Sequence, residues 1–198
     1  MSNQLLPLFL FALAGAITPG PNNMISAGSG AAFGFRRTLP QIWGVTFGFF
    51  VMLMAIGMGL GTLFMAIPYM HVTLKVVGSA YLLFLAWKIA NAGGPDAGGA
   101  VEKSMTLLQS ALFQWVNPKA WTLALSMVPA FTTVGGENLF TEVLVIALVC
   151  GIVTLPSLAL WAGFGVLLAR FMSSPGQRRM VNYAMAALVA GSDLMLFV

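Results

Sequence analysis

Long apolar runs, separated by short polar breaks, dominate the pattern along this chain. A helix needs about 20 apolar residues to cross the hydrocarbon core of a bilayer, which is roughly 30 Å thick. Six runs reach that length, and they cover residues 4–28, 39–66, 69–91, 104–131, 138–170 and 179–198. They predict an all-α integral membrane protein with six transmembrane helices.

The composition supports the same class. Of the 198 residues, 59% are hydrophobic and 7% are charged, which leaves too few charged side chains to cover a soluble domain. We therefore expect a single transmembrane domain, residues 1–198, with the lipid bilayer as its surroundings. The Lys and Arg residues stand singly or in pairs instead of forming a basic patch, so no nucleic-acid partner is expected.

The chain offers little for catalysis or metal binding. It contains one cysteine, Cys150, and one histidine, His71, so neither a disulfide framework nor a metal cluster is expected. There is no phosphate-binding loop or dinucleotide fingerprint. We predict a protein that is not an enzyme and has no cofactor; an intramembrane enzyme would have to depend on His71 or Asp193.

Positive charge sets the expected orientation. Short cytoplasmic loops collect Lys and Arg, and here the first, third and fifth loops carry them while the second and fourth carry none. We therefore expect the chain to lie in the inner membrane of the cell, with both termini on the outer side.

Two of the predicted spans are interrupted near their middles. The first contains residues 18–23, Thr-Pro-Gly-Pro-Asn-Asn, and the fourth contains Asn117, Pro118 and Lys119. Proline has no amide hydrogen and leaves a carbonyl one turn earlier without its helical partner. Pro19 and Pro118 are 99 residues apart, on either side of a linker at 91–100. The chain therefore predicts two repeats of three helices each, about 1–91 and 104–198. Because three is an odd number, the second repeat would cross the membrane in the opposite direction to the first.

Broken helices in inverted repeats build the substrate site of many secondary transporters. The freed backbone groups need partners at membrane depth, and the nearby amides and hydroxyl are suited to provide them. The alternative is that these polar residues only repair a proline kink. The candidate substrate-binding residues are Thr18, Pro19, Gly20, Pro21, Asn22, Asn23, Asn117, Pro118 and Lys119.

Two ionisable residues lie deep in predicted spans. Lys119 is expected to face the bundle interior, where it either binds a substrate carboxylate or holds the broken fourth helix. Asp193 is the coupling candidate: it pairs with Lys119 or Lys75, binds a substrate amine or carries a proton. A shift of the last span would instead place Asp193 near the outer headgroups.

The motifs resemble one known family. Residues 18–22 (Thr-Pro-Gly-Pro-Asn), 34–37 (Gly-Phe-Arg-Arg) and 117–120 (Asn-Pro-Lys-Ala) look like those of the LysE/RhtB family of amino-acid exporters, over essentially the whole chain. Asn23, Gly34-Phe35-Arg36 and residues 85–90 look most like the branch that exports cysteine and O-acetylserine. The resemblance implies efflux of small neutral amino acids.

We expect alternating-access efflux of a small amino acid, with the proton as coupling ion and a second copy of the chain as a candidate partner. The rival hypothesis is a membrane interaction or assembly protein without transport. Its working surface would be the glycine pairs with G-x-x-x-G spacing, which let helices approach closely. These pairs are Gly30/Gly34, Gly44/Gly48 and Gly57/Gly61.

Overall fold

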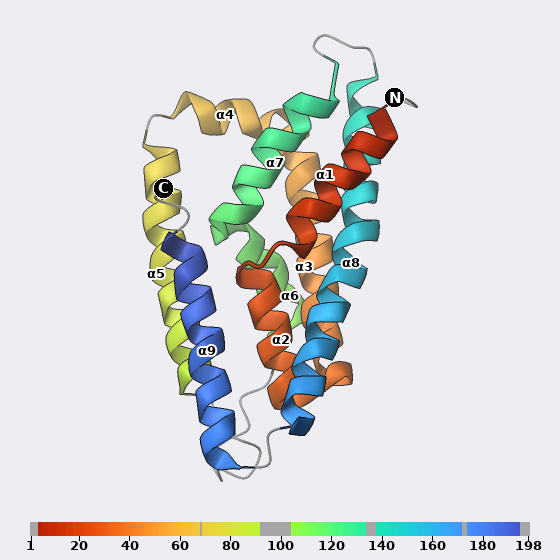
Figure 1. Ribbon diagram of the computed structural model, residues 1–198. Coiled ribbons are helices and arrows are strands. Elements are labelled where there is room, and N and C mark those ends of the chain that lie inside the picture. Colours follow the sequence, from red (N-terminus) through yellow and green to blue (C-terminus); the bar gives the residue numbers. More distant parts are fainter. Residues whose placement is uncertain (1–3, 68, 92–103, 134–137, 172–173, 195–198) are drawn as a thin grey trace.

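The computed structural model describes residues 4–67, 69–91, 104–133, 138–171 and 174–194, and these residues form a helical bundle without strands (Figure 1). The predicted linker at 91–100 lies outside the described residues, except for Asn91. The elements are α1 (Leu5–Ile17), α2 (Pro21–Phe33), α3 (Phe35–Ala55), the π-helix η2 (Ile56–Leu60), α4 (Gly61–Ala66), α5 (Met70–Ala90), α6 (Leu107–Phe113), the 3-10 turn η3 (Gln114–Val116), α7 (Pro118–Phe131), α8 (Leu139–Phe171) and α9 (Pro175–Leu194).

Both predicted breaks are present. Helix α1 ends at Ile17, and α2 begins at Pro21 after a bend of 54°. In the second break, η3 ends at Val116 and Asn117 is extended before Pro118 opens α7. Proline suits the first position of a helix because its missing amide hydrogen would have no partner there. Each proline therefore ends one half-helix and starts another.

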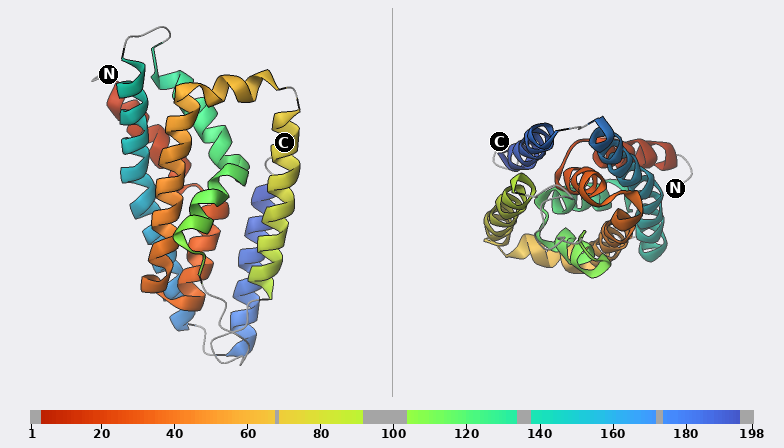
Figure 2. Two further views of the ribbon diagram at one scale, coloured as in Figure 1. Left: turned by 180° about the vertical axis from the view of Figure 1, so that it is seen from behind. Right: turned by 90° about the horizontal axis from the view of Figure 1, so that it is seen from below.

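The second predicted span, 39–66, corresponds to a helical stretch with different bounds and a bend. Helix α3 begins earlier, at Phe35, and continues into η2, where Gly59 has φ 117°. Glycine adopts this backbone conformation readily because it has no Cβ. Beyond this bend, α4 turns across one end of the bundle (Figures 1 and 2). The residues that cross the bundle therefore end near Gly59.

Several helices are compatible with a membrane. In the described part of the chain, three are long and apolar enough to cross one, at Phe35–Leu63, Val72–Ala90 and Leu139–Phe171. The bent pair α1 and α2 meets the same test as one broken span. The regions predicted as the fourth and sixth spans are helical, with α6, η3 and α7 in the fourth and α9 in the sixth. The count of six stays a prediction.

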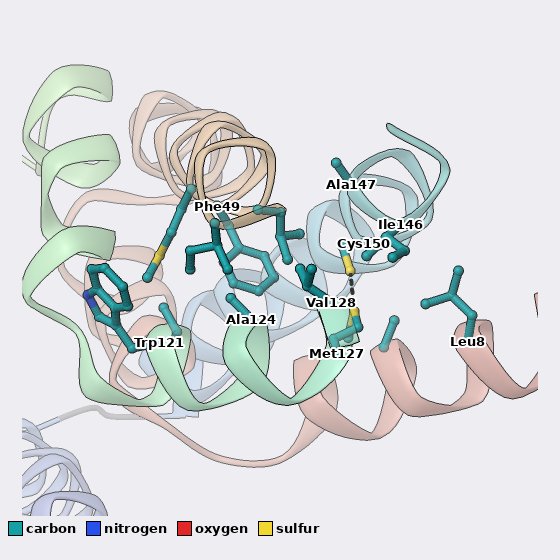
Figure 3. Packing of buried hydrophobic residues seen from close by; sticks show 14 of the residues in the cluster. Leu8, Phe49, Trp121, Ala124, Met127, Val128, Ile146, Ala147 and Cys150 are labelled. Carbon is teal, nitrogen blue, oxygen red and sulfur yellow. Dashed lines mark hydrogen bonds between the residues drawn. The ribbon is translucent and has the colours of Figure 1, made fainter. Parts of the chain in front are cut away.

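The largest buried cluster joins α1, α3, α7 and α8. Leu8, Phe49, Ala124 and Ile146 pack together in it, as Figure 3 shows. Cys150 is 2% exposed in the same cluster, with its Sγ 3.2 Å from the Sδ of Met127. This agrees with a packing role for the chain's one cysteine.

Small residues let α2 and α8 approach closely. A Cβ on Gly30 would strike the backbone of Ala162, and a Cβ on Gly165 would strike the backbone of Ala27. Such reciprocal contacts are typical of close helix packing in membranes, where dispersion contacts replace the hydrophobic effect. Of the predicted Gly30/Gly34 pair, only Gly30 packs in this way; Gly34 has φ 83° and joins α2 to α3.

Positive charges gather at one end of the bundle. Arg36 and Arg37 lie in the first turn of α3, Lys88 in the last turn of α5, Arg170 in the last turn of α8 and Arg179 near the start of α9. These helix ends lie together at the end opposite α4 (Figure 1). We name this the charged end.

Candidate functional site

The two helix breaks meet inside the bundle. The Lys119 ammonium, from the first turn of α7, donates to the Thr18 carbonyl at 2.6 Å and to the Pro19 carbonyl at 3.4 Å. Gly20 leaves room for it, because a Cβ at Gly20 would lie 2.8 Å from both the Cδ and the Nζ of Lys119. The prediction that Lys119 faces the interior is confirmed. It holds the break of the first span, not that of the fourth.

Side chains also satisfy the carbonyls at the end of α1. The Asn23 amide donates to Ala16 O at 2.9 Å and to Thr18 O at 3.2 Å. The Ser157 hydroxyl, from α8, donates to Ala16 O at 2.9 Å, and the Thr18 hydroxyl donates to Ala14 O. A helix end without such partners would be costly away from water. Thr18 and Asn23 thus supply the hydrogen-bond partners that were expected for the backbone groups at the break.

A pair of amides connects the breaks a second time. The Asn22 amide nitrogen donates to the Gln114 side-chain oxygen at 2.9 Å, and the Gln114 nitrogen donates back to the Asn22 oxygen at 3.3 Å. Gln114 is fully buried, and our sequence reasoning missed it. The available signal was a polar amide inside an apolar run, three residues before Asn117.

The two half-helices begin differently. Helix α7 is capped by Asn117, whose side-chain oxygen accepts from the Lys119 backbone N–H at 3.1 Å. Helix α2 follows Gly20 and has no side-chain cap. Backbone N–H groups at a helix start attract anions because they carry partial positive charge and lack helical partners. The start of α2 is therefore the more available of the two for an anion.

A small cavity of about 50 Å³ lies where these groups meet. It offers room for a few water-sized groups, since one water needs about 10–15 Å³ by the same measure. Helices α1, α3 and α8 complete its wall, for example with Gly15, Phe49 and Thr154. Among the predicted residues, Gly20, Pro21, Asn22, Asn23, Asn117 and Lys119 line it.

The other predicted residues contribute in different ways. Thr18 and Pro19 present their carbonyls to Lys119, and Pro118 is a buried first residue of α7. The backbone of Asp193 lies in α9, but its side chain is outside the described residues. Its role as a coupling residue stays a prediction.

A second, larger cavity of about 900 Å³ lies toward the α4 end. Gly57 and Gly61 line it from η2 and α4, and Ser126, Pro129 and Thr132 line it from α7. We name this space the outer groove. Residues of α7, η2 and α4 line it, and most of its lining is apolar.

The site contains donors and acceptors for a small zwitterion. An ammonium group, helix N–H groups and amides face carbonyl oxygens at the end of α1. Within the described ranges, no three His, Cys, Asp or Glu side chains gather in a way that would hold a metal ion. The donors and acceptors that are present suit the binding of a small zwitterion.

Comparison with known proteins gives a consistent result. The model of a family described as LysE type translocator matches residues 13–197. The cysteine/O-acetylserine efflux protein of Salmonella typhimurium strain LT2 is 31% identical over 199 residues, covering all of both chains. The protein of the same name from Escherichia coli strain K12 is 30% identical over the same length, again with both chains fully covered. No solved structure gives a significant match.

Proposed function

The chain belongs to the LysE family of translocators, and from this premise we propose that it exports small neutral amino acids or their derivatives from the cytoplasm. The family resemblance of its motifs is thereby confirmed, and so is the prediction that the protein is a transporter and not an enzyme. The names of its relatives support cysteine and O-acetylserine as the first substrates to test.

One observation carries this proposal: two broken helices from opposite halves of the chain meet at a small cavity that ammonium and amide groups reach, inside an apolar bundle. Unwound backbone at membrane depth is tolerated where it lines a cavity, and it forms the binding site in many secondary transporters. The small cavity volume, about 50 Å³, favours a small substrate. An amino acid of the size of cysteine suits such a site better than a long cationic one.

In the proposed complex, the substrate ammonium takes the place of Lys119 at the Thr18 and Pro19 carbonyls. This position already holds an ammonium group, with hydrogen bonds of 2.6 and 3.4 Å. The displaced Lys119 then pairs with the substrate carboxylate, which lies at the uncapped start of α2. Asn22, Asn23 and Asn117 orient the substrate from the cavity wall.

We further propose six spans arranged as two inverted repeats, residues 1–91 and 104–198. The packing supports this arrangement. Helix α1 packs on α8, and its counterpart in the second repeat, α6, packs on α3, which is the counterpart of α8. Two further pairs, α3 with α8 and α5 with α9, each join a helix to its own counterpart. These contacts are the ones that a two-fold axis would relate. The grouped positive charges support a cytoplasmic position for the charged end and an outer position for both termini.

Proton antiport is the proposed driving force, with Asp193 as the candidate carrier. An ionisable residue within a membrane span is a functional candidate because its burial is costly. Replacement of Asp193 by Asn tests this assignment directly. It should abolish the stimulation by a pH gradient while substrate exchange continues.

The function is tested in proteoliposomes loaded with labelled cysteine, O-acetylserine, threonine, leucine or lysine. With a pH gradient imposed, we expect faster release of cysteine or O-acetylserine than in protein-free vesicles, and little release of lysine. Gradient-independent release at the protein-free rate for all five compounds would refute the proposal. A lack of thermal protection by every compound would then favour the non-transporting alternative.

A further inference from the structure

Buried polar side chains continue from the cavity toward the charged end. They come from α2, α3 and α6, and each is at most 8% exposed. The Ser26 hydroxyl donates to the Gln41 side-chain oxygen at 3.0 Å, and the Ser104 hydroxyl donates to that of Ser29 at 3.3 Å. We name Ser26, Ser29, Gln41 and Ser110 the inner polar row.

The row is connected to the substrate cavity. Gln114, which lines the cavity, donates to the Ser110 backbone carbonyl at 2.9 Å from one helical turn away. On α3, Val45 lines the cavity, and Gln41 lies one turn closer to the charged end. On α2, Ser26 and Ser29 follow the cavity residues Asn22 and Asn23. The three helices thus carry polar groups from the cavity toward the charged end.

Two atoms of this row have no hydrogen-bond partner, the Gln41 amide nitrogen and the Ser110 hydroxyl oxygen. Gln41 is 1% exposed and Ser110 is 0% exposed. A buried polar group without a partner destabilises the folded protein, and the bilayer offers no water to compensate. Leucine and alanine at these positions would avoid that cost. The oxygen of Gln41 accepts from Ser26, but the stability of this conformation does not explain the Gln41 amide nitrogen or the Ser110 hydroxyl.

We propose that the inner polar row is the cytoplasmic half of the substrate path, closed in this structure, and that Gln41 and Ser110 bind the amino acid on its way to the cavity. The inference rests on the proposed function. The Gln41 amide donates to the substrate carboxylate, and the Ser110 hydroxyl accepts from its ammonium group. Each unpartnered atom acquires its partner when the path is open.

The backbone indicates which helix moves. Helix α2 is bounded by the break at residues 18–20 and by Gly34, whose φ is 83°. Helices α3 and α6 are locked together, because a Cβ on Gly48 would lie 2.6 Å from the Ala111 Cα and one on Gly44 would strike the Leu107 backbone. The bends at both ends of α2 therefore allow the path to open by movement of α2 away from the α3 and α6 pair and from α8, which it also contacts closely.

The test measures transport of O-acetylserine from each side separately. In inside-out vesicles the cytoplasmic face is exposed. There Gln41→Leu and Ser110→Ala should each raise KM about fivefold or more, because the loss of one hydrogen bond weakens binding by about that factor. In right-side-out vesicles KM should not change. Ser110→Ala should unfold at the same or a higher temperature, since it removes an unpartnered polar atom. Gln41→Leu also removes the acceptor of the Ser26 hydroxyl, so its unfolding temperature is compared with that of Ser26→Ala/Gln41→Leu, which has no such orphaned hydroxyl.

Thr46→Val is the matched control. Thr46 lies on the same helix as Gln41, but its hydroxyl donates to the Ile42 carbonyl of its own helix at 2.9 Å. This variant should keep the wild-type KM on both sides. Wild-type KM in both Gln41 and Ser110 variants, or an equal rise from both sides, would overturn the inference. A wild-type protein without flux would instead refute the proposed function.

A labelling experiment is independent of flux. In a Cys150→Ala background, which has no native thiol, Ser110→Cys should react with a membrane-impermeant maleimide added to inside-out vesicles. O-acetylserine, which has no thiol, should change the rate at least severalfold. Protection of Ser110→Cys from the reagent under all conditions would contradict an opening path.

Discussion

Helices α2 and α7 each follow a break and have nearly equal lengths, 13 and 14 residues, yet they pack in opposite ways. Helix α2 lies against α8 so closely that neither Gly30 nor Gly165 has room for a Cβ. Helix α7 packs in the buried cluster on one face, but its other face lines the outer groove of about 900 Å³ together with η2 and α4. The bundle is thus closed beside α2 and open beside α7.

The sequence register makes this contrast informative. Ala27 and Gly30, which contact α8, lie 99 residues before Ser126 and Pro129, which line the outer groove. This is also the separation of Pro19 and Pro118. Equivalent positions of the proposed repeats are therefore in close backbone contact in one half and line a cavity in the other. In alternating access the two ends open in turn, so the halves would exchange these arrangements.

The largest effect is expected where the two breaks are joined. Lys119→Ala removes both hydrogen bonds to the first break and the cation proposed to receive the carboxylate. Loss of a hydrogen bond to a charged group weakens binding about ten- to a hundredfold. Flux in proteoliposomes should therefore fall by at least that factor. Lys88→Ala, outside the cavity lining, should retain normal flux. Normal flux in Lys119→Ala with normal membrane insertion would remove Lys119 from the site.

An intermediate effect is expected from filling the outer groove. Ser126 is exposed in this structure, so Ser126→Trp should fold normally but obstruct the movement of α7 toward η2 and α4. An overpacking cost of about 1–2 kcal/mol in the closed form would lower its population roughly five- to thirtyfold, and flux should fall accordingly. Leu108→Trp, at a position that is 65% exposed on α6, is the control. Equal flux in the two variants would show that the groove does not close.

The smallest effect on flux, with a change in stability instead, is expected where α2 packs on α8. Gly165→Ala introduces a Cβ against the Ala27 backbone, and such overpacking costs about 1–3 kcal/mol. For a protein of this size the unfolding temperature should fall by roughly 2–12 °C. Gly163→Ala, two residues earlier on α8, has open space for its Cβ and should not lower it. Thermal unfolding in detergent compares the two, and equal temperatures would mean that α2 and α8 are not held together by this contact.

Local chemistry made the two breaks predictable. Pro19 and Pro21 flank Gly20, and Pro118 follows Asn117, so missing amide hydrogens coincide there with residues that suit a helix end. Prolines without such neighbours, Pro40, Pro129 and Pro156, lie inside helices. The roles of Thr18 and Asn23 followed from the same reasoning, because their partners lie within seven residues along the chain. Six of the nine predicted substrate-binding residues line the cavity. They were found because the breaks themselves were visible in the sequence.

Long-range partners were not predictable in this way. Gln114 pairs with Asn22 across 92 residues, and Ser26 pairs with Gln41 between two different helices. A glycine pattern likewise does not distinguish packing from turning: Gly30 meets the Ala162 backbone, whereas Gly34 and Gly59 have positive φ. The bend that directs α4 across the bundle end was missed for this reason.

The sequence by itself determined that the protein resides in a membrane, where its helices break and which family it belongs to. These properties follow from hydrophobic length, from the missing proline amide hydrogen and from a contiguous motif. Only the tertiary structure decided that the Lys119 ammonium lies on the carbonyls of the first break, that α2 is packed while α7 faces a groove, and that Gln41 and Ser110 are buried without partners. Those outcomes depend on which helix faces meet, and contacts between residues far apart in the sequence cannot be deduced from a local sequence pattern.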